Sequence, residues 1–289
     1  MKRLLIIGSR GFVGGWLAER AAASFEVADS AEWGRVEITD PDAVRRLFDR
    51  ARPDYVALPA AISDIDRCER EPELVEAVNA QAPGTIAREC ARAGVRLLFT
   101  SSGAVFDGMR EGYGEGDPVS PVNVYGRSKA RAEQLVLAAM PHAVIARLSL
   151  VLGRARRAAT NAALDRWIES WQAEKPVVAP ADEFRNAIDV AAAADYMLEL
   201  LAAPEARGIY HIGSADALSR LDIVRRVARA LGYPAAMVAP AGTPLAGRAA
   251  RGKHEFLRTG RLAEISRTPV PSCAEVVERC VRAITQTAV

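Results

Sequence analysis

The sequence predicts an α/β fold in which a doubly wound parallel sheet is joined to a smaller C-terminal α/β lobe. Over the first half of the 289 residues, short apolar runs alternate with amphipathic stretches, which is typical of repeated βα units on a parallel sheet. A glycine-rich segment follows the first apolar run, and the alternation weakens after Gly153. The first half should therefore form the sheet, and the second half should add the smaller lobe.

The expected elements follow from the periodicity of apolar residues and from helix caps. In the first half we expect strands at 4–8, 25–29, 55–60, 96–102 and 143–149, with helices at 12–22, 41–51, 73–93 and 125–139. In the second half we expect helices near 161–172 and 190–202 and a strand at 208–212. Ser219 with Asp222, and Ser272 with Glu275, match capping boxes that open two further helices. The segment 239–253 has no period and should be a loop.

Composition excludes several classes of protein. Half of the residues are apolar and 26% are charged, which excludes a disordered chain, a collagen-like repeat and a coiled coil. The formal charge is only +2 and 6% of the residues are aromatic, so we expect no nucleic-acid-binding surface.

The sequence also indicates the cellular setting. No apolar run is long enough for a secretory signal or a membrane helix. The four cysteines are scattered without a C-x-x-C unit, and the three histidines lack metal-ligand spacing. We therefore expect reduced structural thiols, no metal site and a cytoplasmic globular protein.

A glycine loop lies where the first predicted strand turns into the first predicted helix. Gly8, Gly11 and Gly14 form the pattern G-x-x-G-x-x-G, which permits a tight turn and a close approach of a pyrophosphate to the helix N-terminus. This predicts a Rossmann-type dinucleotide-binding domain over 1–150. Residues 151–289 should form mainly a substrate-binding lobe, with segments near 185–213 returning to the first domain. The expected cofactor contacts of the loop are Gly8, Ser9, Arg10, Gly11, Phe12, Val13 and Gly14.

Two residues bear on which dinucleotide is bound. Asp29, at the end of the second predicted strand, could accept hydrogen bonds from the ribose hydroxyls of NAD. Arg10, directly before the second glycine, could pair with the 2′-phosphate of NADP. We favour NADPH, with NADH as the alternative.

A phenol and an ammonium are spaced for carbonyl chemistry. Tyr125 and Lys129 are four residues apart at a predicted helix start, so both lie on one face. A nearby ammonium favours the phenolate and should bring the phenol pKa toward the working range of a general acid. Ser102, at the end of the fourth predicted strand, is the expected third partner, with Ser101 as its competitor. The alternative is a helix start with a buried tyrosine and an ordinary lysine.

The glycine loop, the strand-end serine and the Tyr-x-x-x-Lys pair together resemble the extended short-chain dehydrogenase/reductase family, and most closely its dTDP-4-dehydrorhamnose reductases. The resemblance covers nearly the whole chain, through segments at 60–69, 77–87, 101–108, 121–129, 147–153, 208–232 and 257–262. It implies that Ser102, Tyr125 and Lys129 are the catalytic set and that Ala60 and Ala61 contact the cofactor. The glycine loop also resembles that of GDP-fucose synthases, which use NADPH and carry an arginine at the position of Arg10.

The chain departs from the family at positions that face the sugar. Gly103 and Ala104 replace a usual Asp-Tyr pair, Leu150 replaces a tryptophan, and Ile62 replaces an aromatic residue. The resemblance therefore implies retained chemistry and an altered sugar pocket that favours a more deoxygenated or bulkier sugar, unless other residues restore the lost contacts. The expected substrate contacts are Ser63, Gly103, Ala104, Leu150 and Arg185, with Arg185 or an arginine within 248–258 as the ligand of the nucleotide diphosphate.

These observations favour an NADPH-dependent reductase of a keto group on a nucleotide-activated deoxysugar. One rival is a non-catalytic NADP-binding protein similar to the regulatory β subunit of methionine adenosyltransferase. Another is a nucleotide-sugar epimerase. Relatives often form homodimers through helices, and no decisive apolar stripe in this sequence marks such a surface.

Overall fold

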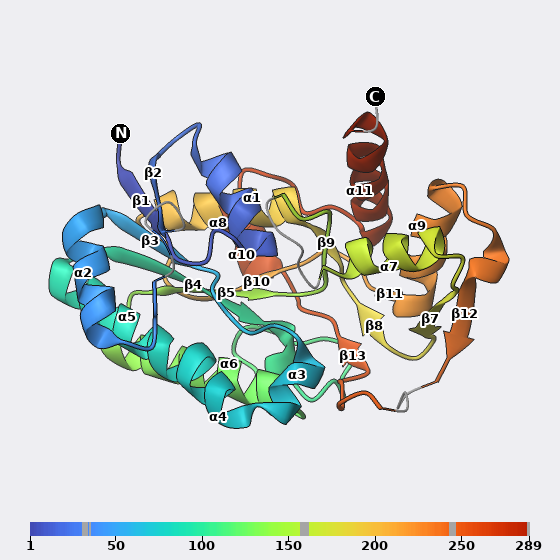
Figure 1. Ribbon diagram of the computed structural model, residues 1–289, viewed down its shortest axis with the longest axis horizontal. Coiled ribbons are helices and arrows are strands. Elements are labelled where there is room, and N and C mark those ends of the chain that lie inside the picture. Colours follow the sequence, from blue (N-terminus) through green and yellow to red (C-terminus); the bar gives the residue numbers. More distant parts are fainter. Residues whose placement is uncertain (31–33, 35, 157–161, 243–246, 288–289) are drawn as a thin grey trace.

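A six-stranded parallel sheet forms the larger part of the molecule (Figure 1). The computed structural model describes residues 1–30, 34, 36–156, 162–242 and 247–287. The strand order is β10-β5-β4-β3-β1-β2, so the order reverses beside β1 and opens a crevice at the carboxyl ends of the strands. The strands are β1 (Arg3–Ile6), β2 (Glu26–Asp29), β3 (Tyr55–Leu58), β4 (Arg96–Ser102), β5 (Val144–Leu148) and β10 (Gly208–Ile212).

Helices cover both faces of this sheet, as the predicted doubly wound fold requires (Figure 1). One face is covered by α1 (Phe12–Ala21), α8 (Val190–Ala202) and α10 (Gly260–Ile265), and the other by α2 (Pro41–Ala51), α5 (Ala82–Ala93) and α6 (Val124–Ala139). Successive strand residues enter opposite cores: Leu4 and Ile6 pack toward α1 and α8, whereas Leu5 packs toward α2 and α5. This double burial explains why the strands are almost continuously apolar.

The helix predicted over 73–93 is present, but it is not α-helical throughout. The chain forms α3 (Ile65–Arg70), α4 (Pro72–Val75), a π-helical segment η2 (Glu76–Gln81) and then α5. Pro83 has no N–H to continue an α-helical ladder, and the N–H of Ala82 donates instead to the carbonyl of Ala77, five residues back. The π-helical segment carries Asn79, which is buried against Ile62 in the loop after β3.

The second half contributes β10 to the main sheet and forms most of a smaller lobe (Figure 1). Its further elements are β6 (Val151–Leu152), α7 (Ala163–Gln172), β7 (Val177–Pro180), β8 (Phe184–Arg185), β9 (Ile188–Asp189), β11 (Leu218–Ser219), α9 (Arg220–Ala230), β12 (Val238–Ala241), β13 (His254–Glu255) and α11 (Cys273–Thr287), with short 3-10 turns η3 (Gly103–Val105) and η4 (Ala235–Met237). Three of these strands pair in the order β11-β8-β13, β12 pairs with β7, and β6 pairs with β9.

Helix caps in this lobe agree with the sequence, whereas part of the predicted loop does not. The hydroxyl of Ser219 accepts the N–H of Asp222 at 3.0 Å, and the N–H of Ser272 donates to the Glu275 carboxylate at 2.7 Å, which confirms both capping predictions. The loop predicted over 239–253 begins in a strand, because Ala239 to Ala241 pair with β7. Their partner lies some sixty residues away and leaves no local pattern. Residues 243–246 of the predicted loop lie outside the described residues.

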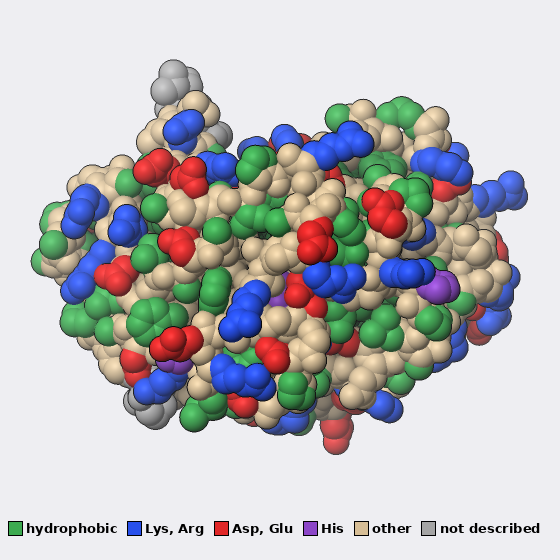
Figure 2. Space-filling view, turned by 180° about the vertical axis from the view of Figure 1, so that it is seen from behind, with side chains coloured by type: hydrophobic (Ala, Val, Ile, Leu, Met, Phe, Trp, Pro, Cys, Tyr) green, Lys and Arg blue, Asp and Glu red, His purple; other side chains and the backbone are tan. Residues whose placement is uncertain are grey.

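The surface and the cysteines have simple features. In the face shown in Figure 2, basic and acidic side chains are interspersed. None of the helices in the described part of the chain combines the length and apolar character needed to cross a bilayer. All four cysteines are buried and free.

A close backbone contact holds α6 against the end of β4. A Cβ atom on Gly126 would lie 2.1 Å from the carbonyl oxygen of Ala104, so only glycine fits there. Asn123 caps the helix by accepting the N–H of Gly126 at 2.7 Å, and its amide donates to the carbonyl of Ala250 at 2.9 Å. The start of α6 is therefore fixed to the sheet and to the smaller lobe at once.

Candidate active site

A pocket of about 1030 Å³ opens at the carboxyl ends of β1, β3, β4 and β5 and extends to the smaller lobe. Its wall begins at the glycine loop, passes the segment after β3, the end of β4 and the first turns of α6, and ends among charged residues of the smaller lobe. Pockets at this edge are the rule for open parallel sheets. The pocket is therefore the candidate active site.

The glycine loop has the geometry of a phosphate cradle. Gly8 has a φ of +108°, and a Cβ on it would lie 2.6 Å from the backbone nitrogen of Ala60. A Cβ on Gly14 would lie 2.1 Å from the carbonyl oxygen of Gly8. Gly11 caps α1 without a side-chain hydrogen bond, so the first N–H groups of the helix and its positive dipole end suit an anion. The residues present thus fit the pyrophosphate of a dinucleotide.

Most of the predicted cofactor residues line the pocket, and three do not. On the wall are Gly8, Gly11, Phe12, Val13, Gly14, Ala60 and Ala61. Asp29 is only 2% exposed and accepts a hydrogen bond from the hydroxyl of Ser9. Arg10 is exposed beside the loop. Ser9, Arg10 and Asp29 lie outside the set of residues that form the wall.

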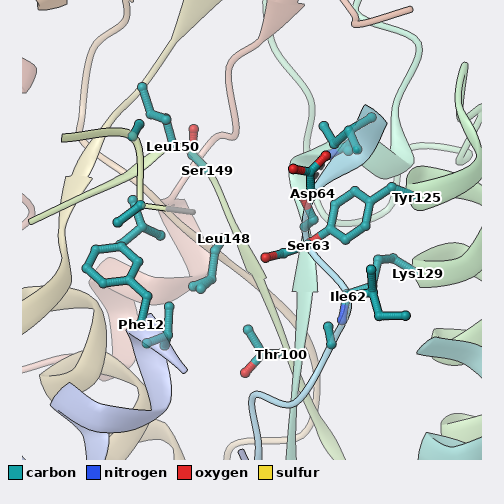
Figure 3. Close-up of a pocket in the computed structure, with 18 of the residues that line it drawn as sticks. Phe12, Ile62, Ser63, Asp64, Thr100, Tyr125, Lys129, Leu148, Ser149 and Leu150 are labelled. Carbon is teal, nitrogen blue, oxygen red and sulfur yellow. Dashed lines mark hydrogen bonds between the residues drawn. The ribbon is translucent and has the colours of Figure 1, made fainter. Parts of the chain in front are cut away.

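The three predicted catalytic residues meet at the pocket. Ser102 lies at the end of β4, and Tyr125 and Lys129 project from the first two turns of α6. Figure 3 shows Tyr125 and Lys129 on one side of the cavity, with Phe12 and Leu148 on the other. A carbonyl group between these sides could therefore meet the phenol, the ammonium and the hydroxyl together.

Burial sets the pKa values of the catalytic pair. It raises the pKa of Tyr125 to about 12, and a hydrogen bond with Ser102 only partly opposes the shift. This direction is opposite to the sequence prediction, because the cost of a buried phenolate exceeds any help from the ammonium. Burial also lowers the pKa of Lys129 to about 8, against the opposing charge of Glu133. The Lys129 ammonium lies 4.5 Å from the ring centre of Phe99.

Ser101 is engaged on the other face of β4, as the alternation of strand side chains requires. Its hydroxyl donates to Glu133 at 2.5 Å, and Glu133 accepts two hydrogen bonds from Arg147 at 2.8 and 2.7 Å. Arg147 also lies 3.4 Å from the ring nitrogen of His211, and burial with Arg147 lowers the pKa of His211 to about 3. Ser101 thus belongs to a buried ion-pair network that joins β4, β5, β10 and α6. Both serines line the pocket, but it is Ser102 whose hydroxyl forms a hydrogen bond with Tyr125.

A second buried side chain holds the loop that follows β3. Asn79, in the π-helical segment, accepts the N–H of Ile62 at 2.8 Å and donates to its carbonyl at 2.9 Å. It also donates to the hydroxyl of Ser128 on α6 at 3.3 Å. The pocket wall at Ile62 is thereby tied to the helix that carries Tyr125. π-Helical segments often occur at functional sites.

Four of the five predicted substrate residues line the pocket, and one does not. Ser63, Ala104, Leu150 and Arg185 line the pocket. Gly103 does not line it, and Leu257 packs beside Gly103, with its nearest atom 3.4 Å from an added Cβ.

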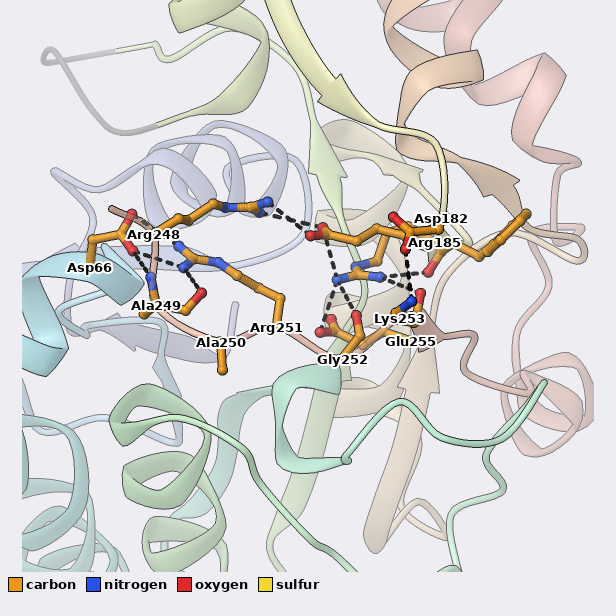
Figure 4. A network of polar contacts seen from close by, with 12 residues as sticks. Asp66, Asp182, Arg185, Arg248, Ala249, Ala250, Arg251, Gly252, Lys253 and Glu255 are labelled. Atoms are coloured by element: carbon orange, nitrogen blue, oxygen red, sulfur yellow. Dashed lines mark hydrogen bonds and ion pairs between the residues drawn. The ribbon is translucent and has the colours of Figure 1, made fainter. Parts of the chain in front are cut away.

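The charged end of the pocket contains residues that the sequence did not single out (Figure 4). Arg185 is 3% exposed and donates to three backbone carbonyls and to Glu255, the last at 3.1 Å. Glu255 and Arg220 also line the wall. Neither lies in a local motif, so only the assembled fold identifies them. Within the described residues, no three His, Cys, Asp or Glu side chains gather as a metal site.

The fold is that of the extended short-chain dehydrogenases/reductases. Within that class, the chain belongs to the family of the RmlD substrate binding domain, whose model matches residues 1–286. The dTDP-4-dehydrorhamnose reductase of Mycolicibacterium smegmatis is 32% identical, over 98% of this chain and 86% of the relative.

Two further comparisons agree with this family. A probable dTDP-4,6-dihydroxy-2-methyloxan-3-one 4-ketoreductase of Streptomyces antibioticus is 31% identical, over 82% of this chain and 80% of the relative. The crystal structure of a dTDP-4-dehydrorhamnose reductase from Bacillus anthracis in complex with NADP superposes with a TM-score of 0.88 at 24% identity, over 98% of this chain and 99% of that one. This structural likeness shows the shared fold.

Breaking the buried ion pair should destabilise the protein strongly. Glu133→Gln leaves the guanidinium of Arg147 buried without a counter-charge, and we expect the free energy of unfolding to fall by about 3–5 kcal/mol. Glu71→Gln is the control, because Glu71 pairs with Arg67 at the surface and such a pair contributes about 0–1 kcal/mol. Urea denaturation measures both. Equal losses in the two variants would contradict a stabilising role for the network.

Proposed function

We propose that this protein is an NADPH-dependent reductase of the 4-keto group of a nucleotide-activated deoxysugar. The observation that carries the proposal is the convergence of Ser102, Tyr125 and Lys129 on a pocket that begins at a phosphate cradle and ends at a basic wall. Membership of the reductase family supports the same activity. Residues 1–150 would bind the cofactor, and residues 151–289 would mainly hold the nucleotide sugar. Four free cysteines suit a reducing cytoplasm.

The chain supplies the proton and the charge stabilisation. NADPH, when bound, supplies the hydride that adds to the carbonyl carbon. Tyr125 donates its phenolic proton to the carbonyl oxygen, so that the ketone becomes a secondary alcohol, and the phenolate regains a proton from solvent. A pKa of about 12 keeps the phenol protonated at neutral pH. The Lys129 ammonium stabilises the phenolate as it forms, and the Ser102 hydroxyl donates a hydrogen bond to the reacting oxygen.

The buried state of Asp29 supports NADPH over NADH. Its carboxylate is bonded to Ser9 inside the protein, whereas ribose recognition needs an acidic group that faces the cofactor. Arg10 lies exposed beside the loop and would pair with the 2′-phosphate.

The sugar pocket suits a substrate with few hydroxyl groups. Ile62, Ala104 and Leu150 give it an apolar wall, and an apolar wall does not select for a hydroxyl. The family relative from Streptomyces antibioticus, named for a dTDP-linked dihydroxy-methyloxanone, supports this substrate class. Two polar groups could restore contacts: Glu255, and the hydroxyl of Ser149, which is buried without a hydrogen-bond partner among the described residues.

Two other functions would give different results. A regulatory protein similar to the β subunit of methionine adenosyltransferase would bind NADP without turnover, and an epimerase would retain NAD through purification. The complete catalytic set favours the reductase. Oxidation of NADPH with a panel of dTDP-, GDP- and UDP-linked 4-ketosugars distinguishes the three.

Removing the proton donor should abolish most of the turnover. Tyr125→Phe keeps the ring and loses the hydroxyl, so we expect kcat to fall by about 10²–10⁴, the usual contribution of a positioned acid, while NADPH affinity is kept. Tyr233→Phe is the control, because Tyr233 packs on Trp171 outside the pocket. NADPH oxidation followed by absorbance measures both. Near-normal turnover of Tyr125→Phe would exclude this residue as the acid.

Arg10 should decide the cofactor preference. We expect the protein to bind NADPH more tightly than NADH, and Arg10→Ala to reduce that difference by about 1.5–3 kcal/mol, the contribution of a charge-assisted hydrogen bond. Fluorescence titration with both cofactors gives the affinities. If the unmodified protein bound NADPH and NADH with equal affinity, Arg10 would not set the cofactor preference, and Asp29 would be the residue to test as a ribose ligand.

The deoxygenated-sugar proposal is tested by specificity. We expect kcat/KM for dTDP-4-keto-6-deoxysugars to rise as ring hydroxyls are removed, because the apolar wall gains about 1–3 kcal/mol per apolar group and the hydroxyls lose solvation. The same coupled assay measures every substrate. A best value for dTDP-4-dehydrorhamnose, near 10⁴–10⁶ M⁻¹s⁻¹ as for a native reaction, would contradict it.

A further inference from the structure

The basic side chains at the charged end of the pocket are nearly all neutralised within the protein (Figure 4). Each of four cations has a carboxylate partner: Arg185 with Glu255 at 3.1 Å, Arg248 with Glu183 at 2.9 Å, Arg251 with Asp66 at 2.8 Å, and Lys253 with Asp182 at 2.8 Å. Such paired cations have little remaining capacity to bind a substrate anion. The arginines that the sequence suggested as diphosphate ligands, Arg185 and those within 248–258, include three of these four.

Arg220 differs from its neighbours. It is the first residue of α9 and lines the pocket. Its Nε is buried and has no hydrogen-bond partner among the described residues. Burial, together with the positive charges of Arg185 and Arg248, lowers the pKa of Arg220 to about 10 against the opposing charges of Glu183 and Glu255, so the guanidinium is still charged at neutral pH. A desolvated cation beside two like charges is unfavourable unless an anion joins it.

We propose that Arg220 binds the diphosphate of the nucleotide-activated substrate. A planar guanidinium with free donors matches the oxygens of a phosphate group, and a dianion would compensate the excess positive charge of this cluster. The inference rests on the proposed function and places the substrate diphosphate at the charged end of the same pocket. The sugar then lies between Arg220 and Tyr125, beside Glu255, whose charge acts on both side chains.

The contacts of Arg185 and Arg248 explain why Arg220 is the proposed ligand, because both of these arginines already use their donors within the protein. Arg185 uses its donors on the carbonyls of Phe184, Gly252 and Lys253 and on Glu255, and so braces β8 against the segment before β13. Arg248 uses two donors on the buried carboxylate of Glu183. These residues shape the wall, and Arg220 is the pocket cation whose buried Nε has no hydrogen-bond partner among the described residues.

Calorimetric titration of TDP into the NADP⁺-saturated protein tests the assignment. We expect Arg220→Met to weaken TDP binding by about 10- to 100-fold, the contribution of a charge-assisted hydrogen bond, with unchanged NADP⁺ affinity. Arg67→Met is the matched control, because Arg67 also lines the pocket but is already held by Glu71 at 2.9 Å. We expect its TDP affinity to stay within about two-fold of the unmodified protein, as for a surface pair.

A melting experiment adds a readout that a purely structural arginine would not give. Removing a desolvated buried cation should raise the Tm of the ligand-free protein by a few degrees, whereas TDP should no longer raise it further. Arg220→Gln, which keeps a polar side chain, should show the same pattern.

The outcomes separate the inference from the function on which it rests. TDP binding by Arg220→Met or Arg220→Gln at the affinity of the unmodified protein would overturn the role of Arg220. The role of Arg220 would also be overturned if both variants melted at a lower Tm than the unmodified protein and every variant that folds bound TDP with unchanged affinity. If the unmodified protein bound none of TDP, UDP and GDP, the proposed function itself would be overturned, and this inference with it.

Discussion

The buried ion pair between Glu133 and Arg147 is the interaction on which the active site depends. Glu133 lies on α6, the helix that carries Tyr125 and Lys129, and Arg147 lies on β5. The hydroxyl of Ser101 also donates to Glu133 and so connects β4, the strand that ends in Ser102, to the same pair. A buried pair of this kind is favourable only when its geometry and hydrogen bonds are nearly complete, and here both oxygens of Glu133 are engaged. The network therefore fixes the catalytic groups before any substrate arrives, which is how a site avoids reorganisation during the reaction.

The charge character of the pocket wall changes from one end to the other, because different elements of the fold form each part of the wall. The glycine loop and the open end of α1 provide an anion cradle at one end, and a desolvated arginine provides a cation at the other. Between them, burial keeps Tyr125 protonated and lowers the pKa of Lys129 to about 8, so most of the Lys129 side chains are still ammonium ions at neutral pH. A protonated phenol between these two ends suits the proposed substrate and cofactor, which each carry a diphosphate and would meet at a carbonyl carbon.

The local features of the fold could be predicted from the sequence, and the non-local ones could not. The strand 96–102, the helix 190–202 and the caps at Ser219 and Ser272 depend on neighbouring residues, and the structure confirms them. The π-helical segment before Pro83 and the strand at 239–241 depend on a missing donor and on a distant partner. The proposed catalytic residues could be named from their spacing, but the raised pKa of Tyr125 and the lowered pKa of Arg220 arise only from burial in the assembled pocket.

Transfer of a labelled hydride tests the central claim most directly. The unmodified protein would be given NADPH carrying deuterium at the transferable position of its nicotinamide, together with a dTDP-linked 4-ketosugar, and the product would be examined by mass spectrometry and NMR. This account predicts one deuterium on the former carbonyl carbon of each product sugar, with one NADP⁺ formed for each sugar reduced. A sugar product that carries no deuterium at that carbon, or that forms without NADP⁺, would contradict it.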